Sequence, residues 1–366
     1  MSLITKSYAE QDQLAFYEAI NIGFDRAKSQ LGSTLDQYFR IADRVVLLQF
    51  VGPALTRHII PALAHLEIEP VPQDEVNFTV RLFDSKSTQA PMPLMVKSIV
   101  DLLRYRWWEH LDNRREMLGY NGDRIRSVFH LGPDIMSVLD LETNSAVYWI
   151  EDADNVPYYE MGYPLTTLLN WWLGAQDCFF LHAASIGTPA GGILLAGKGG
   201  SGKSTTTLAC VESDLQICGD DYCVVGNDAI PIAYSLYNSS KLKGEEDLER
   251  FAQHKDKIVN LDKLETEKAT MFLHEHFPGK MMASMPIKAL FVPEVTGKPK
   301  TRIVPAPASA GFKALAPATI FQLAGNGQAA FKAMVRLSRQ VPCYKIELGT
   351  EIDKIPSVIK EFLDQC

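Results

Sequence analysis

The spacing of apolar residues along the first half of the chain predicts a mixture of helices and strands. Phe16, Ile20 and Phe24 recur near helical spacing and predict a helix over residues 7–32. The same reading predicts further helices at residues 53–66 and 94–105, and strands at residues 38–51, 76–83 and in several pieces within 124–150. Residues 1–160 are therefore expected to form an α+β domain.

The pattern changes after Pro157, where short buried strands alternate with helices. Strands are expected at residues 179–186, 191–196, 215–218, 222–225, 287–292, 301–304 and 343–348, and helices at residues 164–173, 204–211, 317–323, 327–337 and 354–363. Strand, loop, helix and strand in this order are typical of an α/β domain, which we expect over residues 161–366. The polar segment 237–270 is expected to be a mobile excursion or a helical insertion.

The composition adds limits to this picture. The 366 residues suffice for two domains, and 46% hydrophobic with 22% charged residues is typical of a globular protein. A formal net charge of -8 argues against broad binding to nucleic acid or to an anionic membrane. No apolar run reaches the ~18 residues of a membrane span, and we find no secretory signal. The scattered cysteines predict buried thiols, so we expect a cytoplasmic protein.

A glycine-rich loop carries the clearest chemistry. The segment from Gly197 to Ser204 reads GKGGSGKS and matches the phosphate-loop pattern G-x-x-x-x-G-K-[ST] between a predicted strand and a predicted helix. Glycines allow the backbone N–H groups to point at anionic oxygens, and the helix dipole adds to the attraction. Lys203 would contact the β- and γ-phosphates, and the Ser204 hydroxyl would ligate Mg²⁺. The loop predicts a nucleotide-binding site.

Two carboxylates and a histidine flank this loop in the sequence. Asp220 and Asp221 follow an apolar stretch, where one could hold Mg²⁺ and the other could accept a proton from an attacking hydroxyl. A turn rich in aspartate is the alternative interpretation of the pair. His182 lies in a predicted strand, from which it could donate to a transferring phosphoryl group; alone it would more often be a core residue.

Together these residues resemble a known family. The order of His182, the phosphate loop and the Asp220–Asp221 pair is similar to that in the catalytic domain of HPr kinase/phosphorylase and, more closely, in the bacterial HPr-kinase-like proteins. The segments LHAASIG, LLAGKGGSGKSTTTLAC, GDDYCVV and VPCYKIELGT carry the resemblance. It implies a phosphoenolpyruvate-carboxykinase-like P-loop fold for the second domain, and the α+β domain before it shows no resemblance to the N-terminal domain of HPr kinase.

The resemblance also implies a role for each residue. Asp221 would be the general base, Asp220 and Ser204 would hold the metal, and His182 would stabilise the transferred group, although the division of work between the two aspartates stays open. Lys203 would act both in catalysis and in binding. The nucleotide-binding residues would be Gly197, Lys198, Gly199, Gly200, Ser201, Gly202, Lys203, Ser204 and Thr205. ATP and Mg²⁺ are the implied cofactors.

The sequence also departs from the family. HPr kinases carry a further glutamate after the paired aspartates and an arginine-containing substrate loop, and we find neither here. The leading hypothesis is a kinase that phosphorylates a hydroxyl of a small molecule, a peptide or a protein serine. The alternatives are a nucleotide-binding regulatory or assembly protein and, last, a carboxykinase-type enzyme. Further candidates for phosphate or substrate contact are Lys241, Lys243, Lys280 and Arg302. The N-terminal domain could recognise the acceptor or a partner, and homo-oligomerisation stays open.

Overall fold

The chain folds into two compact units of mixed α/β structure. The computed structural model describes residues 9–227, 229–322 and 327–366. Among these, residues 9–61 and 67–175 form the N-terminal unit, and residues 62–66 with those from 176 onward form the C-terminal unit. The expected α/β class is confirmed. The division falls at residue 175, later than the expected boundary at residue 160.

One helix accounts for the later division. The sequence places the apolar segment 164–173 in the second domain, but helix α6 (Thr166–Ala175) packs within the N-terminal unit. The ring of Trp172 stacks on Phe78 with centroids 4.6 Å apart, and its indole N–H donates to Asn144 Oδ1 over 3.1 Å. The apolar pattern predicts that this helix is buried, and it does not reveal in which core.

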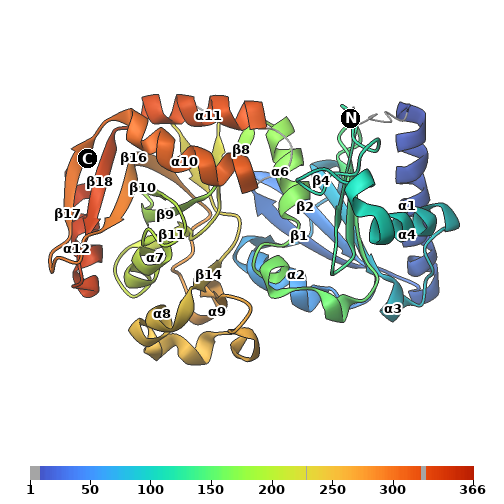
Figure 1. Cartoon of the computed structure of the whole chain (residues 1–366), viewed down its shortest axis with the longest axis horizontal. Coiled ribbons are helices and arrows are strands. Elements are labelled where there is room, and N and C mark those ends of the chain that lie inside the picture. Colours follow the sequence, from blue (N-terminus) through green and yellow to red (C-terminus); the bar gives the residue numbers. More distant parts are fainter. Residues whose placement is uncertain (1–8, 228, 323–326) are drawn as a thin grey trace. The chain divides into compact units, whose positions relative to one another are not determined.

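The N-terminal unit is built on a seven-stranded mixed sheet. The strand order is β3-β1-β2-β4-β7-β6-β5. Its strands are β1 (Leu35–Ile41), β2 (Arg44–Phe50), β3 (Glu67–Ile68), β4 (Phe78–Asp84), β5 (Ile125–His130), β6 (Ile135–Asp140) and β7 (Ser145–Ile150). The helices in this part of the chain are α1 (Glu10–Leu31), α2 (Thr56–Leu63), α3 (Ser85–Thr88), α4 (Leu94–His110), α5 (Tyr158–Gly162) and α6. Figure 1 shows α1 and α4 together on one face of this sheet.

The C-terminal unit contains a nine-stranded sheet. Its strands are β8 (Cys178–Leu181), β9 (Ala183–Thr188), β10 (Gly191–Ala196), β11 (Gln216–Gly219), β12 (Cys223–Gly226), β13 (Ile232–Tyr234), β16 (Ser284–Val295), β17 (Arg302–Ala306) and β18 (Cys343–Leu348). The helices are α7 (Lys203–Val211), α8 (Gly244–Arg250), α9 (Leu273–His276), α10 (Ala308–Gln322), α11 (Gly327–Gln340) and α12 (Ile355–Leu363). Helix α10 begins at residue 308, nine residues before the expected start at residue 317.

Strand β10 forms the middle of this unit and is buried on both faces. It pairs in parallel with β16 and antiparallel with β9. Ile193 and Leu195 belong to the core cluster that includes α7 and α12, whereas Leu194 and Ala196 belong to the cluster that includes α10 and α11 (Figure 1). Successive residues of a strand point to opposite faces, so a short continuous apolar run supplies both cores.

The predicted strand over residues 179–186 is two strands, and the break is at His182. β8 pairs with β12, with Leu181 opposite Cys223, and β9 pairs with β11, with Ser185 opposite Gly219. The Ser185–Gly219 pair continues the register of β8 and β12, and the register of β9 and β11 shifts by one residue beyond it, between Gly219 and Ile217. The interruption between the two pairings leaves His182 facing the segment that contains Asp220 and Asp221. Hydrophobic pattern alone cannot show this break, because both halves are equally apolar.

The polar segment 237–270 packs against the core of the C-terminal unit. It forms strand β14 (Ser239–Leu242), helix α8 and, at its end, strand β15 (Ala269–Phe272), which pairs antiparallel with β14. Leu242, Phe251 and Ile258 belong to the core cluster beside α7. Of the two expectations for this segment, the helical insertion agrees with the structure through α8, whereas the paired strands and their packing against the core were not expected.

Two whole-chain expectations can be compared with the structure. The cysteines form no disulfide, and all except Cys366 are buried, as the sequence predicted. Across the described ranges, no helix has both the length and the apolar character needed to cross a membrane.

Candidate active site

The glycine-rich loop connects β10 to α7, as the sequence predicted. Gly200 and Gly202 have φ values of 80° and 101°, a region that residues with a Cβ rarely adopt. A Cβ on Gly202 would also lie 2.4 Å from Leu348 Cδ1. The conformation that directs the loop around the start of α7 therefore requires glycine at residue 202.

Lys203 occupies the first turn of α7 and is almost fully buried. Its Nζ donates a hydrogen bond to the carbonyl oxygen of Gly197 over 2.8 Å, which closes the loop on itself. Burial lowers the pKa of Lys203, while the carboxyls of Asp221 and Asp220 act in the opposite direction. The ammonium group is thus held between the loop and the acidic pair that the sequence singled out.

His182 and Asp221 meet at the interruption between the paired strands. The Nε2 atom of His182 lies 2.5 Å from Asp221 Oδ1, and His182 Nδ1 has no hydrogen-bond partner among the described residues. Burial raises the pKa of Asp221, but the contact with His182 and the nearby charge of Lys203 outweigh it, so the pKa lies below its usual range. Asp221 is therefore an ionised carboxylate at neutral pH.

Asp220 has a different environment, although it is the neighbouring residue. Its Oδ2 accepts a hydrogen bond from Ser240 Oγ over 2.8 Å, and the backbone N–H of Lys241 lies 3.4 Å from the same oxygen. Burial, and then the charge of Asp221, raise the pKa of Asp220, and the hydroxyls of Thr207 and Ser240 oppose this shift. The two carboxyls are therefore driven apart in acidity, a pattern seen where two acids perform different tasks.

These groups border one pocket of about 230 Å³, which we call the loop pocket. Its lining includes Gly199, Lys203, Ser204, Asp221 and His182. The structure thus brings together the glycine-rich loop, the lysine and the histidine–aspartate pair from three separate segments. Asp220 is 1% exposed and does not itself line this pocket.

Several cations surround the loop pocket. Lys241 and Lys243, which the sequence suggested, line it, and so does Lys268, which sequence reasoning missed. Lys280 instead donates to the carbonyl oxygen of Ser213, and Arg302 lies exposed on β17; neither lines the pocket. With Lys203, these three lysines outnumber the two carboxylates of the lining, Asp221 and Asp247. The pocket is therefore attractive to a polyanion although the chain is acidic overall.

The residues present fit a magnesium ion held together with phosphate oxygens. The described part of the chain contains no cluster of three or more histidine, cysteine or acidic side chains that could hold a metal by itself. However, Asp220 Oδ1 is buried without a hydrogen-bond partner among described residues, and the Ser204 hydroxyl interacts with the same carboxyl. One carboxylate and one hydroxyl are typical of Mg²⁺, which usually keeps waters or substrate phosphates as its other ligands.

Comparison with known proteins gives a distant structural match. No family model matches the chain, and no curated protein matches it in sequence. Among solved structures it is similar to the Hpr(Ser) kinase/phosphatase from Coxiella burnetii, at 10% identity and a TM-score of 0.29, with 51% of this chain and 97% of that chain covered. At these values the match supports a remote resemblance in structure, and it assigns no role to any residue.

Proposed function

We propose that this protein is an ATP- and Mg²⁺-dependent kinase that transfers the γ-phosphoryl group to a hydroxyl group. One observation carries the proposal: a glycine-rich loop with its lysine shares a pocket with an ionised carboxylate bonded to a histidine. A site that only bound a nucleotide would need the loop and the lysine. It would not need a half-buried carboxylate kept ionised next to the terminal phosphate position.

The loop would hold the phosphates of the nucleotide. Backbone N–H groups of residues 197–202 and the start of α7 would contact the α- and β-phosphates, and Thr205 lies in this first helical turn. On binding, the ammonium of Lys203 would leave the Gly197 carbonyl for the β- and γ-phosphates, which replace a neutral acceptor by charged ones. Ser204 and Asp220 would hold Mg²⁺, which neutralises charge on the phosphate oxygens.

Asp221 would act as the base in the transfer step. The acceptor oxygen forms a bond to the γ-phosphorus while the bond from that phosphorus to the β–γ bridging oxygen breaks. The hydroxyl proton moves to Asp221, and ADP leaves with the bridging oxygen. His182 holds the Asp221 carboxylate in position and presents its ring at the edge of the pocket that the transferred group would cross. The reaction requires positioning and charge neutralisation rather than a covalent intermediate.

The experiment combines nucleotide binding with transfer. Purified protein, Mg²⁺ and γ-labelled ATP are incubated with a panel of hydroxyl-bearing metabolites and with fractions of a cell lysate, and binding of a fluorescent ATP analogue is measured in parallel. Lys203→Ala should weaken nucleotide binding by roughly tenfold to hundredfold, because a charged hydrogen bond is lost. Asp221→Asn should keep nucleotide affinity within about threefold but lower transfer by about 10²–10⁴-fold.

Exposed Asp262 provides the control, because Asp262→Asn makes the same chemical change outside the site. Transfer by Asp221→Asn at the rate of Asp262→Asn would remove the base from the mechanism. Nucleotide binding without transfer to any acceptor would favour a regulatory or assembly protein. Absence of nucleotide binding would contradict the proposal as a whole.

A further inference from the structure

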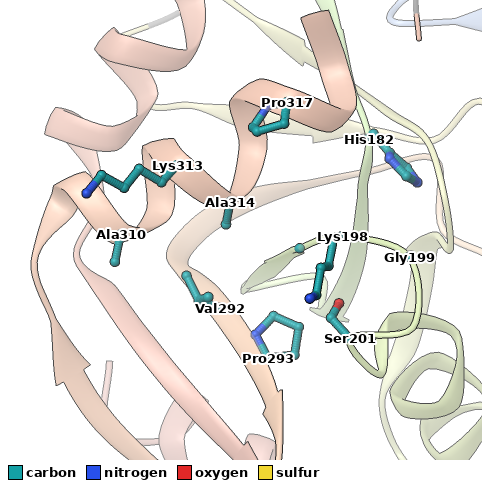
Figure 2. Close-up of a pocket in the computed structure, with 11 residues that line it drawn as sticks. His182, Lys198, Gly199, Ser201, Val292, Pro293, Ala310, Lys313, Ala314 and Pro317 are labelled. Carbon is teal, nitrogen blue, oxygen red and sulfur yellow. The ribbon is translucent and has the colours of Figure 1, made fainter. Parts of the chain in front are cut away.

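A second, larger cavity adjoins the glycine-rich loop. We call it the α10 cleft; it measures about 700 Å³ and lies between the loop, the end of β16 and helix α10. Figure 2 shows Ala310 and Ala314 of α10 facing Val292 and Pro293 of β16, with the loop closing one end. The mechanism above uses His182 and the loop residues that line this cleft, and it gives no role to the residues of β16 and α10.

The position of the α10 cleft follows from the residues it shares with the loop pocket. The two cavities have His182 and Gly199 in common. A smaller pocket of about 120 Å³, the β18 pocket, joins the loop pocket at the other side and shares Gly202 and Thr205 with it. The three cavities therefore adjoin in the order α10 cleft, loop pocket, β18 pocket.

This order assigns one end of a bound nucleotide to each of the two outer cavities, the α10 cleft and the β18 pocket. In a phosphate loop the lysine reaches the β- and γ-phosphates and the helix start holds the α- and β-phosphates. The γ-phosphate would therefore lie towards His182 and Asp221, and the nucleoside towards Thr205. The β18 pocket is then next to the nucleoside, and the α10 cleft is next to the group that is transferred. An acceptor must approach from that second side.

The lining of the α10 cleft defines what it can bind. Its walls are mostly apolar, with Val292, Ala314 and Pro317 among them. Its lining includes two lysines, Lys198 on the loop and Lys313 on α10, and none of the described residues that line it is acidic. Figure 2 shows Lys198 at the loop end and Lys313 at the far end. Such a lining favours an apolar body that carries a negative charge.

We propose that the α10 cleft is the acceptor subsite and that it takes a small hydroxy acid. The hydroxyl would lie next to His182 and Asp221, the apolar chain would lie along Ala314, and the acid group would lie near Lys313. The volume is within the range of small-molecule sites, roughly 300–1,000 Å³, which favours a small acceptor. The inference rests on the proposed kinase function, because it needs the γ-phosphate at the His182 side.

Three probes of equal length test the charge preference. They are 6-hydroxyhexanoate, hexane-1,6-diol and 6-aminohexan-1-ol, and each is titrated into the full chain saturated with Mg²⁺ and a non-hydrolysable ATP analogue. Calorimetry or ligand-observed NMR gives the three dissociation constants. The carboxylate should bind at least roughly threefold more tightly than the diol, and the diol more tightly than the amine, as expected for exposed charge interactions. Equal affinities, or the reverse order, overturn the inference.

Two variants place the binding in the cleft. Ala314→Trp fills the space and should abolish binding of 6-hydroxyhexanoate, whereas Ala308→Trp adds the same bulk to α10 outside the cleft. Lys313→Glu keeps an exposed position on the helix and should weaken binding by roughly three- to tenfold, whereas Lys300→Glu makes the same charge change elsewhere. Equal effects of Lys313→Glu and Lys300→Glu would contradict the placement even if Ala314→Trp did not fold.

Failure of this inference can be told apart from failure of the proposed function. A fluorescent ATP analogue is titrated into the same samples. Nucleotide binding that is intact in Ala314→Trp and Lys313→Glu, together with their loss of probe binding, supports the acceptor subsite. Intact nucleotide binding with no probe bound by the unmodified chain overturns the subsite alone. If the unmodified chain binds no nucleotide, the kinase proposal fails and the acceptor assignment fails with it.

Discussion

Replacing Ser240 by alanine should weaken the metal site from behind, without touching the nucleotide. The Ser240 hydroxyl donates to Asp220 Oδ2 over 2.8 Å, and both side chains are 1% exposed. The N–H of Lys241 lies 3.4 Å from the same oxygen and forms a weaker bond, and the hydroxyls of Thr207 and Ser204 also interact with the Asp220 carboxyl. A hydrogen bond to a charged group contributes about 1.5–3 kcal/mol, and about 2 kcal/mol corresponds to roughly a thirtyfold change in an equilibrium constant.

Loss of the Ser240 hydrogen bond destabilises mainly the ionised form of Asp220, which is the form that binds a cation. Ser240→Ala should therefore raise the Mg²⁺ concentration for half-maximal nucleotide binding by roughly thirtyfold, while binding of the nucleotide without metal changes little. A fluorescent ATP analogue titrated with Mg²⁺ measures this shift. Ser239, adjacent on β14 and equally buried, provides the control. Its side chain points to the opposite side of the strand.

Both serine variants should lose about 1–3 kcal/mol of unfolding free energy, because each removes a buried hydroxyl. Only Ser240→Ala should shift the Mg²⁺ titration. Superimposable Mg²⁺ curves for Ser239→Ala and Ser240→Ala would refute the positioning role of Ser240 and, with it, the assignment of Asp220 to the metal.

Two further predictions concern the loop and a buried histidine. Alanine at residue 202 would have a positive φ and would also clash with Leu348, whereas alanine at residue 200 would have a positive φ in open space. Gly202→Ala should therefore weaken nucleotide binding at least about tenfold more than Gly200→Ala. Equal losses of affinity would contradict the packing argument. Burial, with His274 nearby, lowers the pKa of His65 to about 3, so the unfolded chain takes up a proton below pH 6.5 that the folded chain does not. The unfolding free energy should therefore be highest above pH 6.5 and decrease as the pH falls towards 3. In His65→Gln this decrease should be smaller by up to ~1.36 kcal/mol per pH unit. Urea unfolding from pH 7.5 to 4.5 measures the dependence, and equal slopes of unfolding free energy against pH for the two proteins would disprove the prediction.

The sequence predicted the elements whose signals are local. The glycines of residues 197–202 and the apolar strand before them determine a strand, a loop and a helix within a short window, and the structure has all three. Helix α1 and strands β5 to β7 were likewise predictable, because each is marked by its own periodicity and by turn residues.

The parts of the candidate site that sequence reasoning missed depend on pairing between distant segments. The break at His182 exists because the strand changes its partner there, which apolar periodicity does not encode. Ser240 and Lys268 lie in the polar segment 237–270, which the sequence suggested to be a mobile excursion or a helical insertion. Ser240 is buried on β14 and bonded to Asp220, and Lys268, although exposed, lines the loop pocket. Polarity alone does not distinguish a buried polar strand such as β14 from an exposed one. The signal available was Ser240 within a short strand-like run, next to Lys241.

The α10 cleft could not be predicted from sequence for a related reason. Alanine and proline on a helix, and a valine–proline pair at a strand end, carry no chemical pattern of their own. They become a binding surface only when the fold places them opposite the glycine-rich loop. A sequence pattern identifies residues with reactive or charged side chains, but it does not identify residues that contribute only to the shape of a cavity.

The interrupted pairing of residues 178–188 with residues 216–226 determines where the chain tolerates insertions. His182 and Asp221 are 39 residues apart, and their contact depends on the pairs next to the break, Leu181 with Cys223 and Ser185 with Gly219, which share one register. Added residues in the turn between β9 and β10 would lengthen a loop and leave that register unchanged. A single residue inserted directly after Ala183 would shift the rest of strand β9 by one position and turn its side chains to the opposite face. Insertion scanning across this region should therefore alternate between silent and inactivating sites over a distance of only a few residues.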